Sequence, residues 1–435
     1  MSPDILTLGM FGSLIVLIML GVSLSFALGG VAVTFILIMH GPAGLFPVVS
    51  AVFTNMWSIL LAAVPLFVFM GVALARSRIS HDLYQAFYVW SGKVHGGLLL
   101  GTTGFAAVLS AMTGSSAAAT LTTGMVGMPS MEARGYDRKF MLGTIGAAGT
   151  LGVLIPPSIT LIVIGMTTGL SVGKLFMGGL IAGLIMLGVM LAYVAIRARL
   201  NPELAPAAGI SVPLPEKLRA LRAVIPPLTI IVVVLASIFL GLATPTEAAA
   251  VGAFAVTVAI GFRGEINRTF IREVTYITAT TTGMVMWIVF GATAFVSVYS
   301  SGGGIQFMQN ALLSLDISPW GLIIVMQLVA LVLGMFLDPV GIILMALPIF
   351  YPLVIKLGFD ALWFCVIFQV NLCIGYITPP FGYNIFYLKS LRPDTRITSL
   401  YRALMPFIIL MILCGALFMA VPDILIKGID LLAVK

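Results

Sequence analysis

Long apolar runs separated by short polar segments dominate the pattern of the chain. Eight of these runs have the composition of simple membrane-crossing helices, and they cover residues 5–20, 25–39, 56–75, 174–196, 223–240, 245–262, 274–299 and 403–421. Residues 80–90 are more amphipathic and predict a helix that lies along the membrane surface. The pattern therefore predicts an all-α polytopic membrane protein.

Two further apolar segments turn back on themselves. Residues 97–131 predict a re-entrant helical hairpin with its tip near Gly114–Ser116, where small polar residues separate two apolar arms. Residues 320–356 predict a second hairpin with its tip near Leu337–Pro339. Hairpin tips at membrane depth are a feature of the sites of secondary transporters.

Two more apolar segments are interrupted by paired prolines. Residues 140–168 contain Pro156 and Pro157, and residues 361–388 contain Pro379 and Pro380. Each pair removes backbone donors in mid-span, so carbonyls upstream lose their usual partners and the helix breaks. Irregular backbone at membrane depth persists only where protein or an aqueous cavity satisfies it, so both breaks are candidate midplane sites.

The basic residues indicate the orientation. If the chain crosses at these places, all but four of the 22 Lys and Arg fall on one side, the exceptions being Lys174, Lys356, Lys427 and Lys435. Basic loops stay in the cytoplasm, which places the N-terminus outside. The first hairpin then enters from the cytoplasm and the second from outside.

The chain also matches itself at an offset of 223 residues (379 − 156). Within a 29-residue window six residues are identical, pairing Pro129 with Pro352, Gly135 with Gly358, Asp137 with Asp360, Gly152 with Gly375, and Pro156–Pro157 with Pro379–Pro380. The hairpin tips coincide too, and an odd number of crossings separates them. This predicts an inverted repeat, which is a pointer to a transport site; the alternative is chance similarity of two apolar segments.

Composition excludes several classes of protein. Of 435 residues 60% are hydrophobic and 9% charged, with a mean hydropathy of +1.17, which no soluble globular protein has. The net charge of +7 lies in short loops, where it sets topology and does not indicate a nucleic-acid partner.

Cys365, Cys373 and Cys414 have no metal-ligand spacing and are expected to be buried free thiols. No nucleophile–base set, phosphate loop or paired carboxylates support an enzyme. The first run follows Asp4 without a basic region, so we expect a span and not a cleaved signal peptide.

The tips and breaks supply oxygens suited to a small cation. Hydroxyls and freed carbonyls offer several oxygens at short range without burying a full charge. The first predicted cage comprises Thr113, Gly114, Ser115 and Ser116 facing Gly149, Thr150, Gly152, Ile155 and Pro156. The second comprises Leu337 and Asp338 facing Asn371, Gly375 and Thr378. The alternative for the serines is ordinary packing of small residues between helices. The helix N-termini after each break would favour an anionic substrate.

Two acidic residues within apolar segments have two interpretations. Asp338 is a candidate functional charge because it lies within a span, yet Asp338-Pro339 is also a favourable helix start. We favour the helix cap. Thr244 and Glu247 similarly predict a capping box, in preference to a proton relay.

Five motifs together resemble the large membrane subunit of the tripartite ATP-independent periplasmic (TRAP) transporters of bacteria and archaea. They are TGSSAAAT, LIPPS, GLATPTEAAAVGA, FLDPVGIILMALPIFYP and YITPPFGYN, and the resemblance covers essentially the whole chain.

The resemblance implies sodium-driven uptake of an organic acid, such as a C4-dicarboxylate, sialic acid or another sugar or keto acid. It implies an elevator-type transport domain carried on a scaffold, and no cofactor besides sodium as the coupling ion. The sodium sites would fall at the two cages above. The substrate would lie between the tips, near Ser115, Ser116, Pro157, Ser158, Pro379 and Pro380.

The same resemblance implies partners and a location. A separate small four-span membrane subunit and a periplasmic substrate-binding protein would complete the system, in the bacterial inner membrane with a periplasmic N-terminus. The expected division has five parts: scaffold spans and surface helix (1–92), first hairpin and broken helix (93–170), connecting scaffold (171–315), second hairpin and broken helix (316–390), and final span and tail (391–435).

Two other hypotheses remain open at this point. One is a stand-alone sodium:anion symporter of the wider ion-transporter superfamily, which shares hairpins and inverted repeats. The other is a membrane scaffold without transport of its own. The identity of the organic acid is beyond the sequence.

Overall fold

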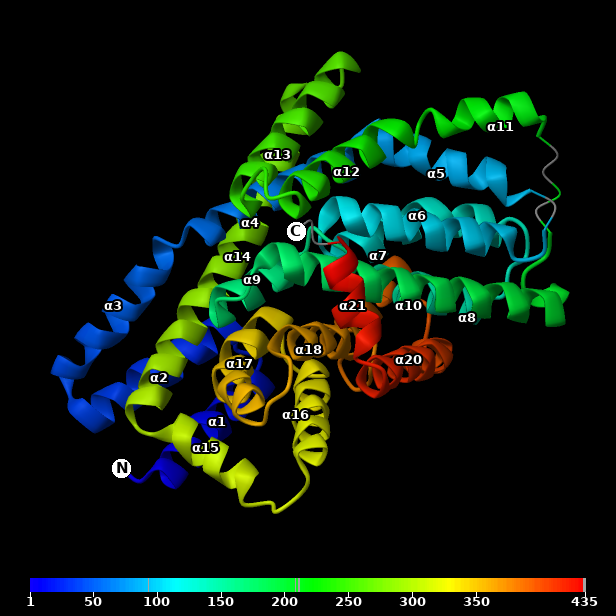
Figure 1. Cartoon of the computed structure of the whole chain (residues 1–435). Helices are drawn as coiled ribbons and strands as arrows, with labels where there is room; N and C mark the ends of the chain where they lie inside the picture. The colour runs from blue at the N-terminus through cyan, green and yellow to red at the C-terminus, as the bar shows by residue number, and fades with distance from the viewer. Residues whose placement is uncertain (93, 208, 210–211, 433–435) are drawn as a thin grey trace.

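The computed structural model describes residues 1–92, 94–207, 209 and 212–432, which form helices joined by short connections, with no strand among them (Figure 1). The N-terminal helices are α1 (Pro3–Met19), α2 (Leu24–His40), η1 (Pro42–Gly44), α3 (Leu45–Met56), α4 (Ile59–Arg76) and α5 (Arg78–Ser91). Helices α2, α3 and α4 pack against the long helix α14 (Arg268–Ser301). In Figure 1 α1, α2, α3 and α14 form one side of the molecule, and α5 lies on the other side.

The first predicted hairpin and broken helix are both present. The hairpin is α6 (Gly97–Thr113) and α7 (Ser116–Glu132), whose arms pack against each other. The broken helix is α8 (Arg138–Thr150), the 3₁₀ turn η2 (Leu151–Val153) and α9 (Ile159–Thr168).

The second hairpin and broken helix follow the same order. The hairpin is α16 (Pro319–Gly334) and α17 (Pro339–Lys356), and the broken helix is α18 (Ala361–Gly375) and α19 (Tyr383–Leu391). At the 223-residue offset the first residues of α7 and α8 coincide with those of α17 and α18. Asp137 and Asp360, which also coincide, each cap the following helix by accepting a backbone N–H bond. The opposite orientation of the two copies in a membrane stays a prediction.

The two units exchange packing partners. Helix α19 packs along α7 of the first hairpin, and α9 packs along α17 of the second. Each hairpin is therefore completed by the distal half of the other copy's broken helix, so the two copies form one interlocked core.

The remaining helices connect and cover this core. They are α10 (Val172–Leu200), η3 (Pro202–Leu204), α11 (Leu214–Leu221), α12 (Ile225–Phe239), α13 (Pro245–Phe262), α15 (Gly304–Leu313), α20 (Ile397–Ala420) and α21 (Asp423–Leu432). The capping box of Thr244 and Glu247 that the sequence predicts starts α13. Helix α10 packs against α6, α18 and α21, and α20 packs against α8. The five-part division of the chain stays a prediction.

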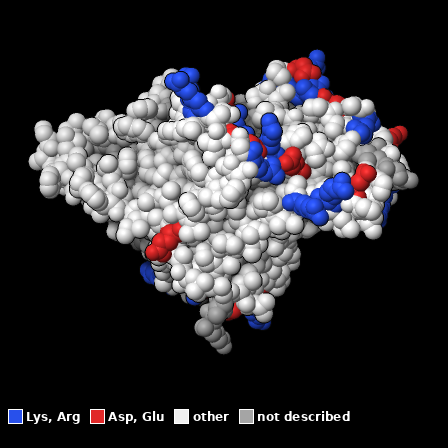
Figure 2. Space-filling view, turned by 90° about the horizontal axis from the view of Figure 1, so that it is seen from above, with Lys and Arg blue, Asp and Glu red and all other residues white. Residues whose placement is uncertain are grey.

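Among the described residues, six helices are long and apolar enough to cross a membrane: α4, α10, α13, α14, α17 and α20. Shorter apolar helices, α1, α2 and α6 among them, accompany these six. Figure 2 shows charged residues from the middle of the molecule to its right end and at its lower edge, whereas the left end, formed by α3, which contains no charged residue, is apolar on this face. A long apolar surface with charge confined to one part is typical of a multi-pass membrane protein.

Four α-helices were not expected from the sequence: α3, α11, α15 and α21. Residues 300–319, between the predicted span 274–299 and the predicted second hairpin, contain α15, and residues 45–56 form α3 ahead of the predicted third span. Helix α15 lies in the second copy where α5 lies in the first, between a long helix and a hairpin, and Figure 1 places α5 and α15 at opposite ends of the molecule.

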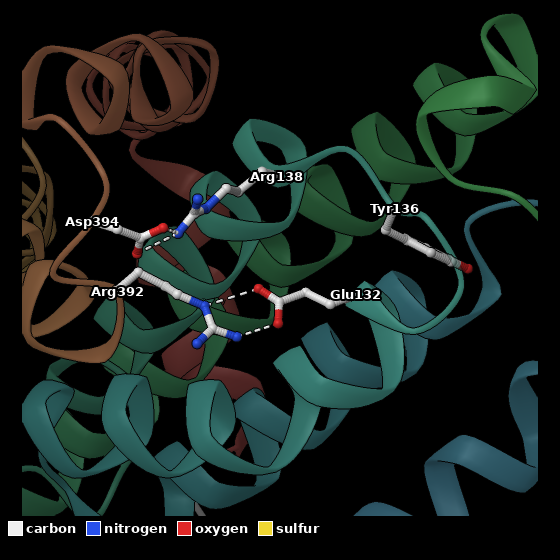
Figure 3. Close-up of a pocket in the computed structure, with 5 residues that line it drawn as sticks. All are labelled: Glu132, Tyr136, Arg138, Arg392 and Asp394. Carbon is white, nitrogen blue, oxygen red and sulfur yellow. Dashed lines mark hydrogen bonds and ion pairs between the residues drawn. The ribbon is translucent and has the colours of Figure 1, made fainter.

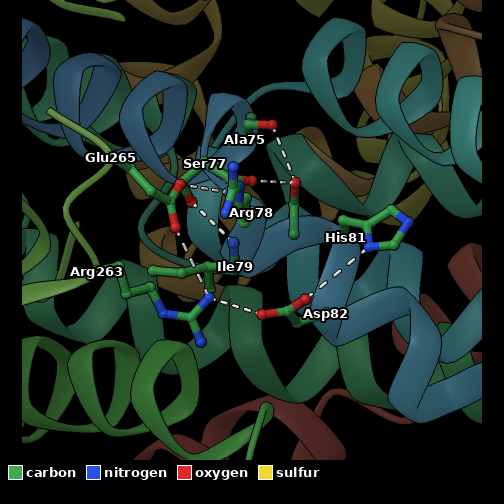
Figure 4. Close-up of polar contacts among 9 residues, drawn as sticks. Ala75, Ser77, Arg78, Ile79, His81, Asp82, Arg263 and Glu265 are labelled. Carbon is green, nitrogen blue, oxygen red and sulfur yellow. Dashed lines mark hydrogen bonds and ion pairs between the residues drawn. The ribbon is translucent and has the colours of Figure 1, made fainter. Parts of the chain in front are cut away.

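A polar cluster fixes the start of α5 (Figure 4). Its first backbone N–H, that of Arg78, donates to Glu265 Oε2 at 2.7 Å, and Arg263 pairs with Asp82 at 2.7 Å. Both partners come from the α13–α14 connection, 187 and 181 residues along the chain. The amphipathic helix that links α4 to the first hairpin is thus held at one end by the α13–α14 connection.

Candidate functional site

The first hairpin tip is built from three consecutive small residues. Helix α6 ends at Thr113, and Gly114 takes the left-handed conformation (φ +58°), which an L side chain rarely adopts. Ser115 is extended, and its hydroxyl accepts the backbone N–H of Ala118, which caps α7. The chain therefore reverses within two residues and starts a new helix at Ser116.

This tip lies directly against the first break, as the sequence predicts. A Cβ at Gly114 would lie 2.4 Å from the carbonyl oxygen of Pro157. A Cβ at Gly152 would lie 2.8 Å from the carbonyl carbon and oxygen of Ser115. Only glycines allow backbone to approach backbone this closely. Thr113, Gly114 and Ser116 are buried in the tip, as are Gly149 to Ser158 in the break.

Side chains donate hydrogen bonds to a backbone carbonyl that the first break leaves without its helical partner. Pro156 and Pro157 remove the donors that the carbonyls of Gly152 and Val153 would meet in a continuous helix. The Val153 carbonyl instead accepts from Ser158 Oγ at 2.6 Å and from Gln369 Nε2 at 2.7 Å. Ser158, a predicted substrate residue, is fully buried and its hydroxyl proton is used within its own break.

Thr150, a predicted cation ligand, is also fully buried, and its hydroxyl donates to the carbonyl of Ala147 at 2.7 Å. Since the donated proton points toward Ala147, the other side of the hydroxyl oxygen remains available as an acceptor. Ile155 N–H donates to the carbonyl of Leu151 at 2.8 Å, which keeps one tight turn after α8.

The second tip starts α17 with a side-chain cap. Asp338 Oδ1 accepts the backbone N–H of Val340 at 2.9 Å, with Pro339 at the first helical position. The capping geometry that the sequence favours for Asp338 is therefore present. Leu337 is buried, and Asp338 is partly exposed.

The second break packs on the second hairpin through Gly375. A Cβ there would lie 2.8 Å from the carbonyl carbon of Gly334, the last residue of α16. Thr378 Oγ1 donates to the carbonyl of Ile374 at 2.6 Å. Asn371 does not turn to the tip: its amide nitrogen donates to Gln327 in the middle of α16.

The two sites differ in exposure. The first break is buried throughout, whereas Pro379 is partly exposed and Pro380 is exposed. Aromatic rings surround the second break, with Phe336 on Phe381 at 5.5 Å and Tyr376 on Tyr383 at 5.6 Å between ring centroids. The second site is therefore the more open and the more aromatic of the two.

One residue of the second copy reaches the first tip, and sequence reasoning missed it. Ser116 Oγ donates to Asn384 Oδ1 at 2.8 Å, and Asn384 Nδ2 donates to the carbonyl of Gly146 in α8 at 2.8 Å. Asn384 is fully buried. The available signal was its place at the start of the helix that follows the second break, in YITPPFGYN.

Two surface pockets of about 480 Å³ each lie away from the predicted site. The first is lined by Glu132, Tyr136, Arg138, Arg392 and Asp394 (Figure 3). The second is lined by residues of α5 and α7, among them His81, Tyr88 and Met125. No predicted site residue lines either pocket.

Ion pairs in the first pocket join the two copies. Arg392, just after α19, donates from Nε to Glu132 at the end of α7 at 2.8 Å, and a second guanidinium nitrogen pairs with the same carboxylate (Figure 3). Arg138 binds Asp394 at 2.6 Å, which holds the pKa of that carboxyl below its usual value. These contacts hold the last residue of α7 and the first residue of α8 to the α19–α20 connection.

The His, Cys, Asp and Glu side chains of the described part of the chain do not form a ligand cluster. No group of three His, Cys, Asp or Glu side chains there is arranged to hold a metal ion. Cys365, Cys373 and Cys414 are free and buried, as expected.

Comparison with known proteins gives the family. The profile of "Tripartite ATP-independent periplasmic transporter, DctM component" matches residues 11–424. The C4-dicarboxylate TRAP transporter large permease protein DctM of Pseudomonas aeruginosa is 32% identical over 356 residues, 81% of this chain and 82% of the relative. The isethionate TRAP transporter permease protein DctMQ of Oleidesulfovibrio alaskensis is 29% identical over 404 residues, 93% of this chain and 63% of the relative.

A solved structure shares the fold. The YdaH transporter of Alcanivorax borkumensis superimposes with a TM-score of 0.62 over 88% of both chains, at 16% sequence identity. The similarity supports the helical membrane fold alone. Together with the family profile and the apolar helices, it makes this a multi-pass membrane protein. The chain belongs to the DctM family, the large permease component of TRAP transporters.

Proposed function

We propose that this chain is the permease through which a TRAP system takes up a small organic anion, driven by sodium and supplied by a periplasmic binding protein. The observation that carries the proposal is the contact of the first hairpin tip with the first break, where Gly114 meets Pro157 and Gly152 meets Ser115 in buried surroundings. Relatives named for C4-dicarboxylates and isethionate support an acidic substrate.

Sodium suits the donor atoms at the tips. Thr113, Ser115, Ser116 and the carbonyls around Gly149 to Ile155 offer neutral oxygens, and oxygen is the ligand atom that hard cations prefer. A cation held by neutral oxygens leaves a net positive charge in the membrane interior. That charge lowers the cost of bringing an anion to the same depth, which gives the coupling a physical basis.

Helix N-termini suit the anion. The positive ends of α7 and α17 lie at the tips, beginning at Ser116 and Pro339. The hairpin arms α6, α7 and α16 contain no Lys or Arg, and α17 has only Lys356 at its far end. Without a guanidinium to bind a carboxylate with two hydrogen bonds, affinity for the free anion is modest. A binding protein that delivers the substrate would raise its effective concentration at the outer face.

Two partners complete the proposed system. One is the periplasmic binding protein, and the other is a small four-span membrane subunit. The isethionate relative is longer than this chain, which covers 63% of it, so that relative has room for a further subunit in the same chain. In this proposal the interlocked hairpins and broken helices move together against the helices around α14, as an elevator.

The test is stepwise reconstitution into liposomes with an inward sodium gradient and labelled ligand at micromolar concentration. We expect uptake to be negligible with this chain alone and to reach full rate only when the small subunit and the loaded binding protein are both added. Replacing sodium by choline at equal ionic strength should abolish it.

Other outcomes separate the rival functions. Full-rate uptake by this chain alone would favour a stand-alone symporter. Uptake that ignores sodium would remove the coupling ion from the proposal. Absence of uptake with all three components and a verified ligand would favour a scaffold without transport.

A further inference from the structure

The amide of Asn384 determines which way the hydroxyl of Ser116 points. Ser116 Oγ is the donor in its 2.8 Å bond to Asn384 Oδ1, so the hydroxyl proton is directed toward α19. The oxygen lone pairs are then directed elsewhere, which is the orientation that a cation-binding hydroxyl needs. A hydroxyl whose proton pointed at the cation would repel it.

The amide cannot easily turn over. Its nitrogen donates to the Gly146 carbonyl at 2.8 Å, and a flipped amide would set its own oxygen against that carbonyl oxygen with no proton between them. Asn384 is fully buried, so water cannot supply the missing partners. The Gly146 carbonyl therefore fixes the Asn384 amide, and the amide fixes the hydroxyl.

The same residue is tied to the second break. The backbone N–H of Asn384 donates to the carbonyl of Tyr376 at 3.0 Å, which closes the chain around Pro379 and Pro380. A change in the geometry of the second break therefore moves the amide that orients Ser116. The counterpart of Asn384 in the first copy is Leu161 (384 − 223), an apolar residue, so this polar link exists in one direction only.

We infer that Asn384 is a positioning residue for cation binding at the first hairpin tip, supplied by the second copy of the repeat. It acts through Ser116 and touches no cation itself. The inference rests on the proposed function, since it specifies how one cation site of that function is held in its binding geometry. Groups that orient a ligand side chain in this way commonly change cation affinity on the order of tenfold when removed.

The experiment measures sodium binding to the purified full-length chain in detergent, without transport. Sodium stabilises the folded chain by mass action, so the sodium concentration for a half-maximal rise in unfolding temperature reports affinity, with choline balancing ionic strength. We expect Asn384→Leu to raise that concentration on the order of tenfold. Asn384→Asp in its protonated form, which burial favours, keeps an oxygen that accepts from Ser116 and an O–H that donates to Gly146, so it should respond to sodium at a concentration near that of the wild type.

A double-mutant cycle separates positioning from general damage. If Asn384 acts through Ser116, Asn384→Leu adds nothing to the sodium response once Ser116→Ala is present. Gln309→Leu is the matched control, because Gln309 is a partly buried amide that joins α15 to α17 by a 3.1 Å bond to Ile349. It should lower the unfolding temperature without changing the sodium dependence.

Each result decides between the two ideas. Additive effects in the cycle, or an unchanged sodium response in Asn384→Leu, would overturn the inference and leave the proposed function standing. If Asn384→Leu does not fold, a sodium response of Asn384→Asp as weak as that of Ser116→Ala would overturn it too. A wild-type chain that sodium does not stabilise would overturn both.

Discussion

Gly375, the last residue of α18, lies against the backbone of Gly334, the last residue of α16, so closely that a Cβ on Gly375 would be 2.8 Å from the Gly334 carbonyl. The second broken helix and the second hairpin therefore meet backbone to backbone at the place where both helices end. There is no flexible side chain at this contact that could move aside.

We expect Gly375→Ala to separate these two helix ends and to destabilise the fold by about 1–3 kcal/mol, the usual cost of overpacking. Gly188→Ala is the control, since Gly188 lies in α10 with nothing within 4 Å of its Cβ position. Thermal unfolding in detergent compares the two. Equal unfolding temperatures for Gly375→Ala and the wild type would show that the contact is looser than described.

The serines of the first tip have separable roles. Ser116→Ala removes an oriented oxygen and its bond to Asn384. We therefore expect sodium binding to weaken by about 1–3 kcal/mol, which raises the sodium concentration needed for uptake. Ser115→Ala also removes the cap of α7, whereas Ser115→Asn keeps one. Sodium titrations of uptake by the complete system measure both. A sodium dependence identical to wild type in Ser116→Ala would exclude its hydroxyl from the site.

Variants of Asp338 separate the role of its negative charge from its role as the cap of α17. Because its carboxylate accepts the Val340 N–H at 2.9 Å, Asp338→Asn should retain the start of α17 and impair uptake less than Asp338→Ala. Uptake rates and unfolding temperatures of both variants provide the measurement. Two equally inactive variants that both fold would mean that the negative charge is needed.

The membrane orientation is testable by labelling. Single cysteines at Ser301 and Ala207, in a background without Cys365, Cys373 and Cys414, should react from opposite sides of the membrane, Ser301 from outside. The structure places Ser301 at the end of α14, beside α15, and Ala207 between η3 and α11. Labelling of both positions by an impermeant reagent applied outside would contradict the orientation and the inverted repeat with it.

The ion pair of Arg138 and Asp394 predicts that the stability of the folded chain depends on pH in the acid range. Its hydrogen bond lowers the Asp394 pKa below the usual 3.8 in the folded chain, which favours the ionised form. The stabilisation is therefore complete above the carboxyl's unfolded pKa and is lost as the pH falls through its lower folded pKa. The difference in unfolding temperature between wild type and Asp394→Asn should be constant near neutral pH and shrink only in strong acid. A difference that grows on acidification would contradict this.

The hairpins and breaks could be predicted from sequence because their signals are local. Gly114 at a left-handed turn, Asp338 ahead of Pro339, and the two proline pairs act on their own few residues of backbone. The predicted bounds of both hairpins therefore fall within a few residues of α6–α7 and α16–α17.

Contacts between distant segments could not be predicted in this way. Asn384 was missed because its partner Ser116 is 268 residues away. Asn371 was assigned to the second tip but bonds Gln327 on the neighbouring arm, a choice that depends on how α16 and α18 pack. Helix α15 was not predicted, because its place in the fold depends on packing against α1, α14 and α17, contacts that its own sequence does not show.

The exchange of packing partners between the two copies has a consequence for synthesis. The ribosome completes the first hairpin and inserts it long before α19 exists, since 268 residues separate Ser116 from Asn384. At about 5–20 residues per second, that interval lasts on the order of tens of seconds. During it the face of α7 that packs against α19 has no partner from its own chain, and Ser116 lacks the Asn384 acceptor. The newly made half of this permease therefore spends that time in the membrane with the α19-binding face of α7 uncovered. Lipid, the insertion machinery or a chaperone must cover that face until the chain is nearly complete.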